Sequence, residues 1–223
     1  MKKTIIAAAL LAAVGVAQAA TVSYQYGLPL VEHTTEISET GMLGMFDSTL
    51  GTLTGATLNI FGSGTTNISL TNNAATNVTG RATASVDLMW SSALAALDAL
   101  LIDDLSLAFT TGGALLYTPG QTRSFGPLHD QASFVYDLTS ILGSIEAAGG
   151  GNFAITCDSL SGIAIIGGGG NLASNQTTTA GCGANITYTY DQRVVTNVPE
   201  PASLALIAAG LIGVGASRRR KSA

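Results

Sequence analysis

Short stretches of alternating apolar and polar residues, separated by turn-forming residues, dominate the middle of the chain. Val22–Tyr26 and Ile186–Tyr190 alternate cleanly, which is the pattern of a β-strand with one buried face. Similar runs lie at Ala56–Phe61, Asn67–Leu70, Ala82–Met89, Leu105–Phe109, Ser133–Tyr136, Asn152–Cys157 and Gly162–Ile166. Gly, Asn, Ser and Thr gather between these runs, as hairpin turns require. The pattern predicts an all-β fold, an Ig-like or jelly-roll-type β-sandwich over residues 20–197.

Two segments have the spacing of an amphipathic helix instead. Ser91–Leu101 is rich in helix formers, and Asp137–Ala147 begins with a residue that favours the N-cap. Their apolar positions recur every three or four residues: Leu94, Leu97 and Leu101 in the first segment, and Leu138, Ile141, Leu142 and Ile145 in the second. We expect one or two short helices that cap an end of the sandwich.

Residues 1–19 have the three parts of a secretory signal peptide. Lys2 and Lys3 form a positive start, residues 4–16 are apolar, and Ala17-Gln18-Ala19 is a small-x-small cleavage site. The alternative is a short N-terminal anchor or core helix, but the apolar part is too short to span a bilayer comfortably, and the Ala-x-Ala site follows it at the right distance. We expect residues 1–19 to form a signal helix that directs export and is removed by cleavage before Ala20. The export machinery and signal peptidase would then be partners of the chain.

The C-terminal segment, residues 198–223, also has three parts. Val198-Pro199-Glu200-Pro201 precedes an uncharged run, Ala202–Ser217, and then the basic cluster Arg218, Arg219, Arg220 and Lys221. Sixteen helical residues would reach roughly 24 Å, close to the hydrocarbon thickness of a bilayer. The basic cluster would stop transfer on the cytoplasmic side. The segment therefore predicts a C-terminal transmembrane helix with residues 20–197 outside the cytoplasm.

In its order and position, this segment resembles the PEP-CTERM sorting signal of Gram-negative bacteria. The resemblance implies that an exosortase, a membrane-embedded cysteine transpeptidase, acts near Pro199-Glu200-Pro201. It also implies a precursor that resides transiently in the inner membrane. The product would then pass to the outer envelope, the cell surface or the extracellular polysaccharide matrix. The alternative is a plain C-terminal anchor that is never cut.

The middle of the chain resembles a second family. Phe46–Leu58 reads FDSTLGTLTGATL, and Gly169–Leu172 and Ile186–Tyr190 follow later in the chain. These stretches are similar to the choice-of-anchor E domain of exported bacterial proteins. The resemblance implies an exported domain but no activity, because the family has none that could be transferred.

Cys157 and Cys182 are the only cysteines. In an oxidising envelope they would form one disulfide, and the alternatives are two free buried thiols or one reactive thiol. His33 and His129 stand at no recognisable metal-ligand spacing from them. We therefore expect no metal and no cofactor.

Few residues suggest catalysis. Ser124, His129 and Asp130 lie close in sequence but without a nucleophile-elbow motif, and the adjacent pair Asp103-Asp104 fits a solvated loop better than a shared ion. Trp90 is either a core residue or a sugar-stacking platform. We expect that the protein is not an enzyme.

Charge is distributed unevenly along the chain. Between the terminal segments, thirteen acidic residues face three arginines, Arg81, Arg123 and Arg193, which makes a formal charge of −10. Such a surface cannot neutralise phosphates, so we expect no nucleic-acid partner. The hypothesis is an exported protein with a structural or adhesive role, with exopolysaccharide as a candidate partner. The alternatives are a carbohydrate-binding module and an unrecognised envelope hydrolase.

Overall fold

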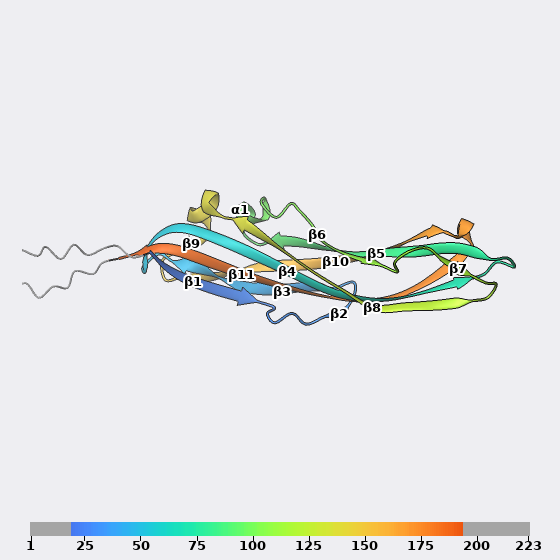
Figure 1. Cartoon of the computed structure of the whole chain (residues 1–223). Helices are drawn as coiled ribbons and strands as arrows, with labels where there is room; N and C mark the ends of the chain where they lie inside the picture. The colour runs from blue at the N-terminus through green and yellow to red at the C-terminus, as the bar shows by residue number, and fades with distance from the viewer. Residues whose placement is uncertain (1–18, 194–223) are drawn as a thin grey trace, which may run out of the picture. The chain divides into compact units, whose positions relative to one another are not determined.

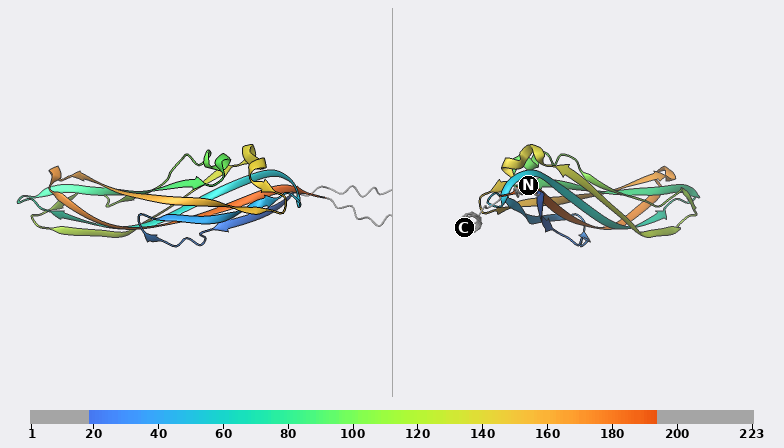
Figure 2. Two further views of the ribbon diagram at one scale, coloured as in Figure 1. Left: turned by 180° about the vertical axis from the view of Figure 1, so that it is seen from behind. Right: turned by 60° about the vertical axis from the view of Figure 1, so that its left-hand side comes forward.

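The computed structural model describes residues 19–193 and shows two β-sheets packed face to face. Figures 1 and 2 show long strands running side by side in two layers. The first sheet has the order β1-β11-β4-β8, and β2 also pairs with β11. Its strands are β1 (Ala19–Tyr26), β2 (His33–Thr34), β4 (Gly51–Asn72), β8 (Thr122–Asp137) and β11 (Leu172–Gln192). The expected β-sandwich is thus confirmed at the level of its two layers.

The second sheet has the order β6-β5-β10-β3-β9, and β7 also pairs with β5. Its strands are β3 (Ser38–Asp47), β5 (Val78–Ser92), β6 (Leu105–Thr110), β7 (Leu115–Tyr117), β9 (Glu146–Ala147) and β10 (Gly151–Gly167). All pairs in both sheets are antiparallel except β3 with β9. Because β3, β7 and β9 lack a clean alternation over enough residues, the sequence pattern did not predict them.

Two pairs of predicted strands are single long strands. Ala56–Phe61 and Asn67–Leu70 both belong to β4, and Asn152–Cys157 and Gly162–Ile166 both belong to β10. Gly62, the first of the two glycines between the first two runs, serves packing, not turning: a Cβ on it would lie 2.2 Å from Cδ1 of Leu88 in the opposite sheet. A small residue is needed there because the two sheets come together closely.

The predicted helices are much shorter than expected. Within Ser91–Leu101 only α1 (Ala95–Asp98) is helical, and β5 continues to Ser92, whose N–H donates to Oδ1 of Asp98 at 2.9 Å. Asp137–Ala147 contains the 3₁₀ helix η1 (Thr139–Ser144). Strands β8 and β9 take both ends of that segment, so one short turn is all that fits between them. The apolar spacing still marks burial, since Leu97, Leu138 and Ile145 are fully buried.

The core between the sheets is apolar and includes most of the aromatic residues. The ring of Tyr188 lies 6.1 Å from that of Tyr24 and 5.8 Å from that of Phe46, and its hydroxyl donates to the backbone oxygen of Gly44 at 2.8 Å. Burial raises the pKa of Tyr188 well above its usual value. This hydrogen bond satisfies the one polar atom that the ring carries into the core.

Candidate functional site

The two ends of the described chain lie side by side at one end of the domain, which we call the base. Ala19 pairs with Asp191, and Ala20 pairs with Tyr190, so β1 begins where β11 ends. Cleavage before Ala20 would leave the rest of β1 paired with β11. The predicted cleavage residues Ala19 and Ala20 therefore adjoin the point where the chain continues toward its C-terminal segment.

The other predicted sorting residues lie outside the described residues. These are Ala17 of the signal peptide, Val198, Pro199, Glu200 and Pro201 of the processing motif, and Arg218, Arg219, Arg220 and Lys221 of the basic cluster. The signal helix and the C-terminal transmembrane helix fall there too. Within residues 19–193, no helix has the length and apolar character needed to cross a membrane.

At the end opposite the base, which we call the tip, three loops meet: those between β4 and β5, between β7 and β8, and between β10 and β11. Asn72 accepts the N–H of Gly120 and donates to the oxygen of Gln121, and Asn73 donates to the oxygen of Asn171 beside the 3₁₀ helix η2 (Gly168–Gly170). Figures 1 and 2 place α1 and η1 in the half of the domain near the base and η2 at the tip.

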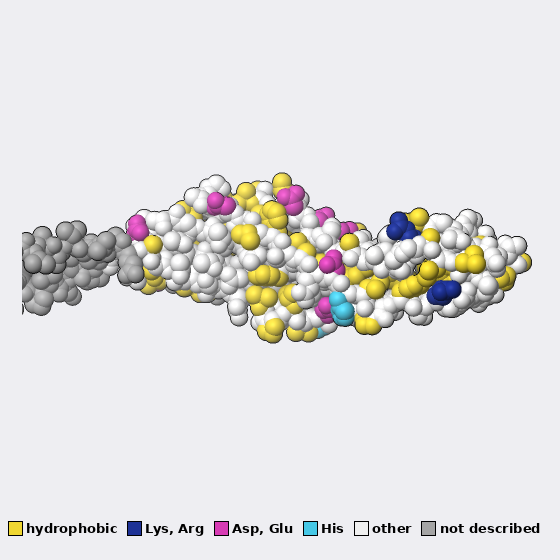
Figure 3. All heavy atoms as spheres, viewed as in Figure 1, with side chains coloured by type: hydrophobic (Ala, Val, Ile, Leu, Met, Phe, Trp, Pro, Cys, Tyr) yellow, Lys and Arg dark blue, Asp and Glu magenta, His cyan; other side chains and the backbone are white. Residues whose placement is uncertain are grey.

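Charge separates along the domain. Residues 65–84, 109–129 and 163–179 form the half around the tip, and they contain no acidic residue and two arginines, Arg81 and Arg123. All the acidic residues of the described chain lie nearer the base or at the middle. Figure 3 shows this division on one face: the dark blue side chains lie near the tip, and the magenta ones lie away from it. The sequence shows the excess of acid but not its placement.

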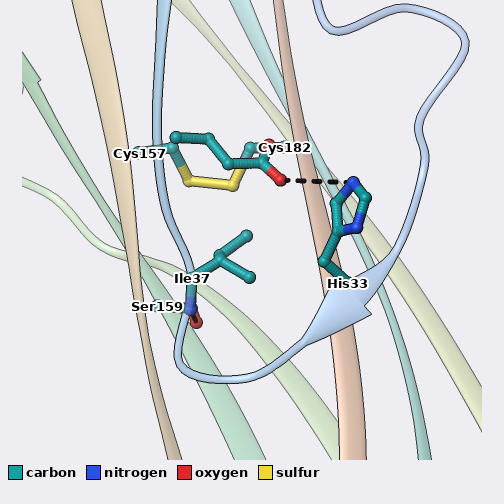
Figure 4. The surroundings of a disulfide bond; sticks show 6 residues. His33, Ile37, Cys157, Ser159 and Cys182 are labelled. Atoms are coloured by element: carbon teal, nitrogen blue, oxygen red, sulfur yellow. Dashed lines mark hydrogen bonds and ion pairs between the residues drawn. A yellow bond between two sulfur atoms is a disulfide. The ribbon is translucent and has the colours of Figure 1, made fainter.

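The expected disulfide joins the two sheets near the middle of the domain. Cys157 of β10 and Cys182 of β11 are bonded, with their Cα atoms 6.4 Å apart. Because the two sulfurs are bonded to each other, the alternatives of free or reactive thiols are wrong. Figure 4 shows the bond between the two strands, with Ile37 and Ser159 beside it. The N–H of Ile37 donates to Oγ of Ser159 at 2.9 Å.

A hollow of about 320 Å³ opens at the edge of the sandwich beside this disulfide. It is lined by Tyr26, His33, Glu39, Thr40 and Cys182, together with Gly27, Pro29 and Val31. Nε2 of His33 lies 3.8 Å from Oε1 of Glu39 (Figure 4). Burial raises the pKa of Tyr26, and the neighbouring Glu39 carboxylate adds to that shift. The hollow thus offers a carboxylate and an imidazole for proton transfer or hydrogen bonding, but its lining includes no serine or free thiol as nucleophile.

The candidate triad residues are not brought together. On β8, Ser124 pairs with Ser69 and His129 pairs with Thr65, with a bulge between the two positions. Nδ1 of His129 lies 2.7 Å from Oγ1 of Thr65 on the outer face. Adjacent residues of a strand point to opposite faces, so Asp130 faces away from His129.

Asp130 instead closes one edge of the sandwich. Its Oδ2 accepts the backbone N–H of Ala108, in strand β6 of the other sheet, at 2.7 Å. Arg123 makes a similar connection nearer the tip, where Nη2 donates to the backbone oxygen of Leu116 at 3.2 Å and the guanidinium lies 5.5 Å from the ring centre of Tyr117. Both side chains of β8 therefore bind edge strands of the opposite sheet.

Replacing Asp130 with alanine should destabilise the domain by about 1 kcal/mol, because the hydrogen bond to Ala108 has an ionised acceptor and links two sheets. Urea unfolding would measure the loss. Asp104→Ala, at an exposed loop carboxylate, is the matched control and should change stability by less than about 0.5 kcal/mol. Equal effects of the two substitutions would show that the connection contributes nothing.

The remaining candidates have structural places. Asp103 and Asp104 are exposed in the loop between α1 and β6, where the Tyr136 hydroxyl donates to the backbone oxygen of Asp103. Trp90 is 4% exposed and packs in the core, so it cannot serve as a sugar-stacking platform. Over the described part of the chain, no three His, Cys, Asp or Glu side chains gather as a metal site.

Comparison with known families identifies the C-terminal segment. Residues 197–221 match the model of the PEP-CTERM protein-sorting motif. The motif implies an exported protein that is anchored in the membrane as a precursor and processed by an exosortase. The resemblance of Phe46–Leu58 to the choice-of-anchor E domain is not confirmed and stays a prediction.

Other comparisons add little. No curated protein matches this sequence. Among solved structures, a structure of the Gx strain of infectious bursal disease virus has a TM-score of 0.18 at 8% identity and covers 80% of this chain. A structure of the Gt strain has a TM-score of 0.14 at 11% identity and covers 88%. The chain spans 37% and 49% of the lengths of those chains.

Proposed function

We propose that this protein is a non-catalytic exported protein of the cell surface or extracellular matrix, sorted through its PEP-CTERM segment, with a structural or adhesive role. The match at residues 197–221 carries the proposal. The position of the base supports it, since β11 ends there at Gln192 and the chain continues from that point toward the matched segment. We propose Val198–Pro201 as the processing motif and Arg218–Lys221 as the stop to transfer.

The described domain is suited to a passive role. Its charged side chains Asp130 and Arg123 bind backbone groups of edge strands, and its tryptophan and most of its tyrosines are buried. A carbohydrate-binding module that stacks sugars on aromatic rings would need those rings at the surface. The adhesive or structural reading is therefore favoured over the carbohydrate-binding alternative, and exopolysaccharide stays a candidate partner only through polar contacts.

Intact mass spectrometry of the protein recovered from its native host, combined with cell fractionation, would test the proposal. We expect a species that begins at Ala20, ends near Pro199-Glu200 and carries added mass from the transfer step, in the outer envelope or matrix fraction. A species that retains Arg218–Ala223 in the inner membrane would show a plain anchor instead. That result would contradict processing and direct the search for function to the periplasm.

A further inference from the structure

Two rows of polar side chains on the outer face of the first sheet are bonded within the protein. Toward the tip, Oγ1 of Thr71 on β4 lies 2.8 Å from Oγ1 of Thr122 on β8. Toward the middle of the domain, Oγ1 of Thr65 on β4 lies 2.7 Å from Nδ1 of His129 on β8. The hydroxyl groups of these two rows are therefore already used.

Between the two rows, five polar side chains have no such partner. None of them makes a side-chain hydrogen bond within the described residues 19–193: Asn67, Ser69, Ser124, Asn175 and Thr177. Ser69 pairs with Asn175 on one side and with Ser124 on the other, and Asn67 pairs with Thr177. Because neighbouring strands lie about 4.8 Å apart, the five groups converge on one hollow of about 210 Å³, which we call the outer hollow.

A β-bulge and a glycine keep the outer hollow open. The register between β4 and β8 shifts between Thr66 and Ile68, so Asn67 has no partner residue on β8. Gly126 lies in this bulge with a φ of +126°, and a Cβ on it would lie 2.7 Å from Oδ1 of Asn67 and 2.8 Å from the backbone oxygen of Thr66. Any other residue would therefore be strained and would displace Asn67. Bulges and strand glycines of this kind recur where a ligand comes close to a sheet.

The lining of the outer hollow is polar but uncharged. Amide side chains both donate and accept hydrogen bonds, and hydroxyl groups do the same. Arg123 precedes Ser124, but its guanidinium lies over the ring of Tyr117 and donates to the backbone oxygen of Leu116, away from the outer face. A charged ligand would find no opposite charge here, whereas a ligand rich in hydroxyl groups would find both donors and acceptors.

A second uncharged hollow, of about 280 Å³, lies around the edge of β11. It is lined by Thr34, Thr35, Ser161, Gln176, Thr177 and Thr178. Thr177 lines both hollows, so the uncharged polar lining is continuous from one to the other. Beside the second hollow, Oε1 of Glu36 accepts the N–H of Ser161 at 3.4 Å, and this carboxylate would repel an anionic ligand.

A peptide fits the outer hollow less well than a sugar chain does. Sheets bind extended peptides through an unpaired strand edge, with pockets for alternate side chains. At the outer hollow β4 is paired on both sides, with β11 and with β8. The sheet therefore presents side chains there, and the backbone of β4 is already used in pairing.

We infer that the outer hollow binds an uncharged polysaccharide, whose hydroxyl groups bond to the five side chains that line it and whose chain continues into the second hollow. The continuity of the two hollows favours a polymer over a single sugar. Phe125 also borders the outer hollow but packs against the core. Contact would thus be made by hydrogen bonds and not by stacking on an aromatic ring.

This mode of contact has a consequence for affinity. Without a stacking platform each site should bind weakly, with a dissociation constant of about 1 mM. The proposed function, on which this step rests, compensates for that weakness. Many copies attached to one surface would hold the same polysaccharide chain at once, and such multivalency raises the overall affinity without new contacts.

Affinity electrophoresis of the mature chain, purified from the envelope fraction of its native host in mild detergent, tests the site. The probe is the neutral fraction of the host's exopolysaccharide, separated from the acidic fraction by anion exchange and cast into a native gel. We expect migration to slow as the neutral fraction is increased and to stay unchanged with the acidic fraction. Raising the salt concentration should not release the neutral polymer, because no ion pair contributes.

A double variant tests the residues that line the outer hollow. Asn67→Ala/Asn175→Ala removes two exposed amides from it and should raise the apparent dissociation constant by about tenfold. Asn73→Ala/Asn171→Ala is the matched control, because it removes two exposed amides of the tip loops outside both hollows. It should bind as the wild type does. Melting temperatures equal to that of the wild type would show that both variants are folded.

Three results would each overturn the inference: no retardation of the wild type by the neutral fraction, retardation by the acidic fraction alone, or equal retardation of the two double variants. Normal processing of a chain that fails to bind would leave the proposed sorting in place. A precursor that stays in the inner membrane but still binds the neutral fraction would instead contradict the proposed sorting alone.

Discussion

Glu200→Ala is expected to leave a full-length precursor in the inner membrane. Glu200 is the one charged residue between Arg193 and the basic cluster at Arg218, and it stands within the matched sorting motif. The flanking prolines Pro199 and Pro201 disfavour helix on both sides, so the sequence predicts extended backbone at Glu200 that a transpeptidase can reach. Removing the carboxylate removes the only charged group of the proposed processing motif Val198–Pro201.

Fractionation followed by intact mass measurement would check this prediction. The mutant should retain residues 202–223, while Ser203→Ala, a change within the adjacent uncharged run, should mature normally. The domain itself should fold unchanged in both variants, because β11 ends at Gln192. Normal maturation of Glu200→Ala would contradict recognition through this residue.

Loss of the Cys157–Cys182 disulfide is expected to have the largest effect on stability. The bond closes a loop with a sequence separation of 25 residues, and such a loop stabilises by about 3 kcal/mol in the chain-entropy model. It also joins the two sheets beside the point where β3 stops pairing with β10 and β2 stops pairing with β11. The sheets should therefore separate more easily at this point when the bond is absent.

The double variant Cys157→Ala/Cys182→Ala separates this effect from that of a free thiol. Its melting temperature should fall by about 6–12 °C, the shift expected for about 3 kcal/mol in a domain of this size. Reductant should lower the wild-type melting temperature similarly and leave that of the variant unchanged. A variant as stable as the wild type would mean that packing alone holds the sheets together at this point.

Much of the organisation could be predicted from sequence because it depends on local patterns. Period-two alternation identified strands near the start and near the end of the domain's sequence, as in Val22–Tyr26 and Ile186–Tyr190, because one buried face imposes that period wherever the strand lies in the chain. The disulfide could be predicted because only two cysteines exist. The sorting motif could be predicted because a short linear signal is read in extended chain and needs no fold.

Other features depend on partners that are distant in sequence. Gly62 reads as a turn but lies inside β4, because a leucine of the opposite sheet occupies the space above it. Asp137–Ala147 has helical spacing but contains only the short 3₁₀ helix η1, because its first residue belongs to β8 and its last two residues belong to β9. His33, Glu39 and Tyr26 line one hollow although they come from three different strands.

The sequence by itself thus determined that the chain carries a PEP-CTERM sorting motif, that the part before it is a β-sandwich and which cysteines are joined. Only the tertiary structure decided how far each strand is paired. Pairing length is a property of two strands, and β3 stops at Ser38 while its neighbour β10 continues to Gly167. That mismatch leaves residues 162–167 of β10 without a partner strand on the β3 side within the described part of the chain, and no local pattern in β10 alone could show it.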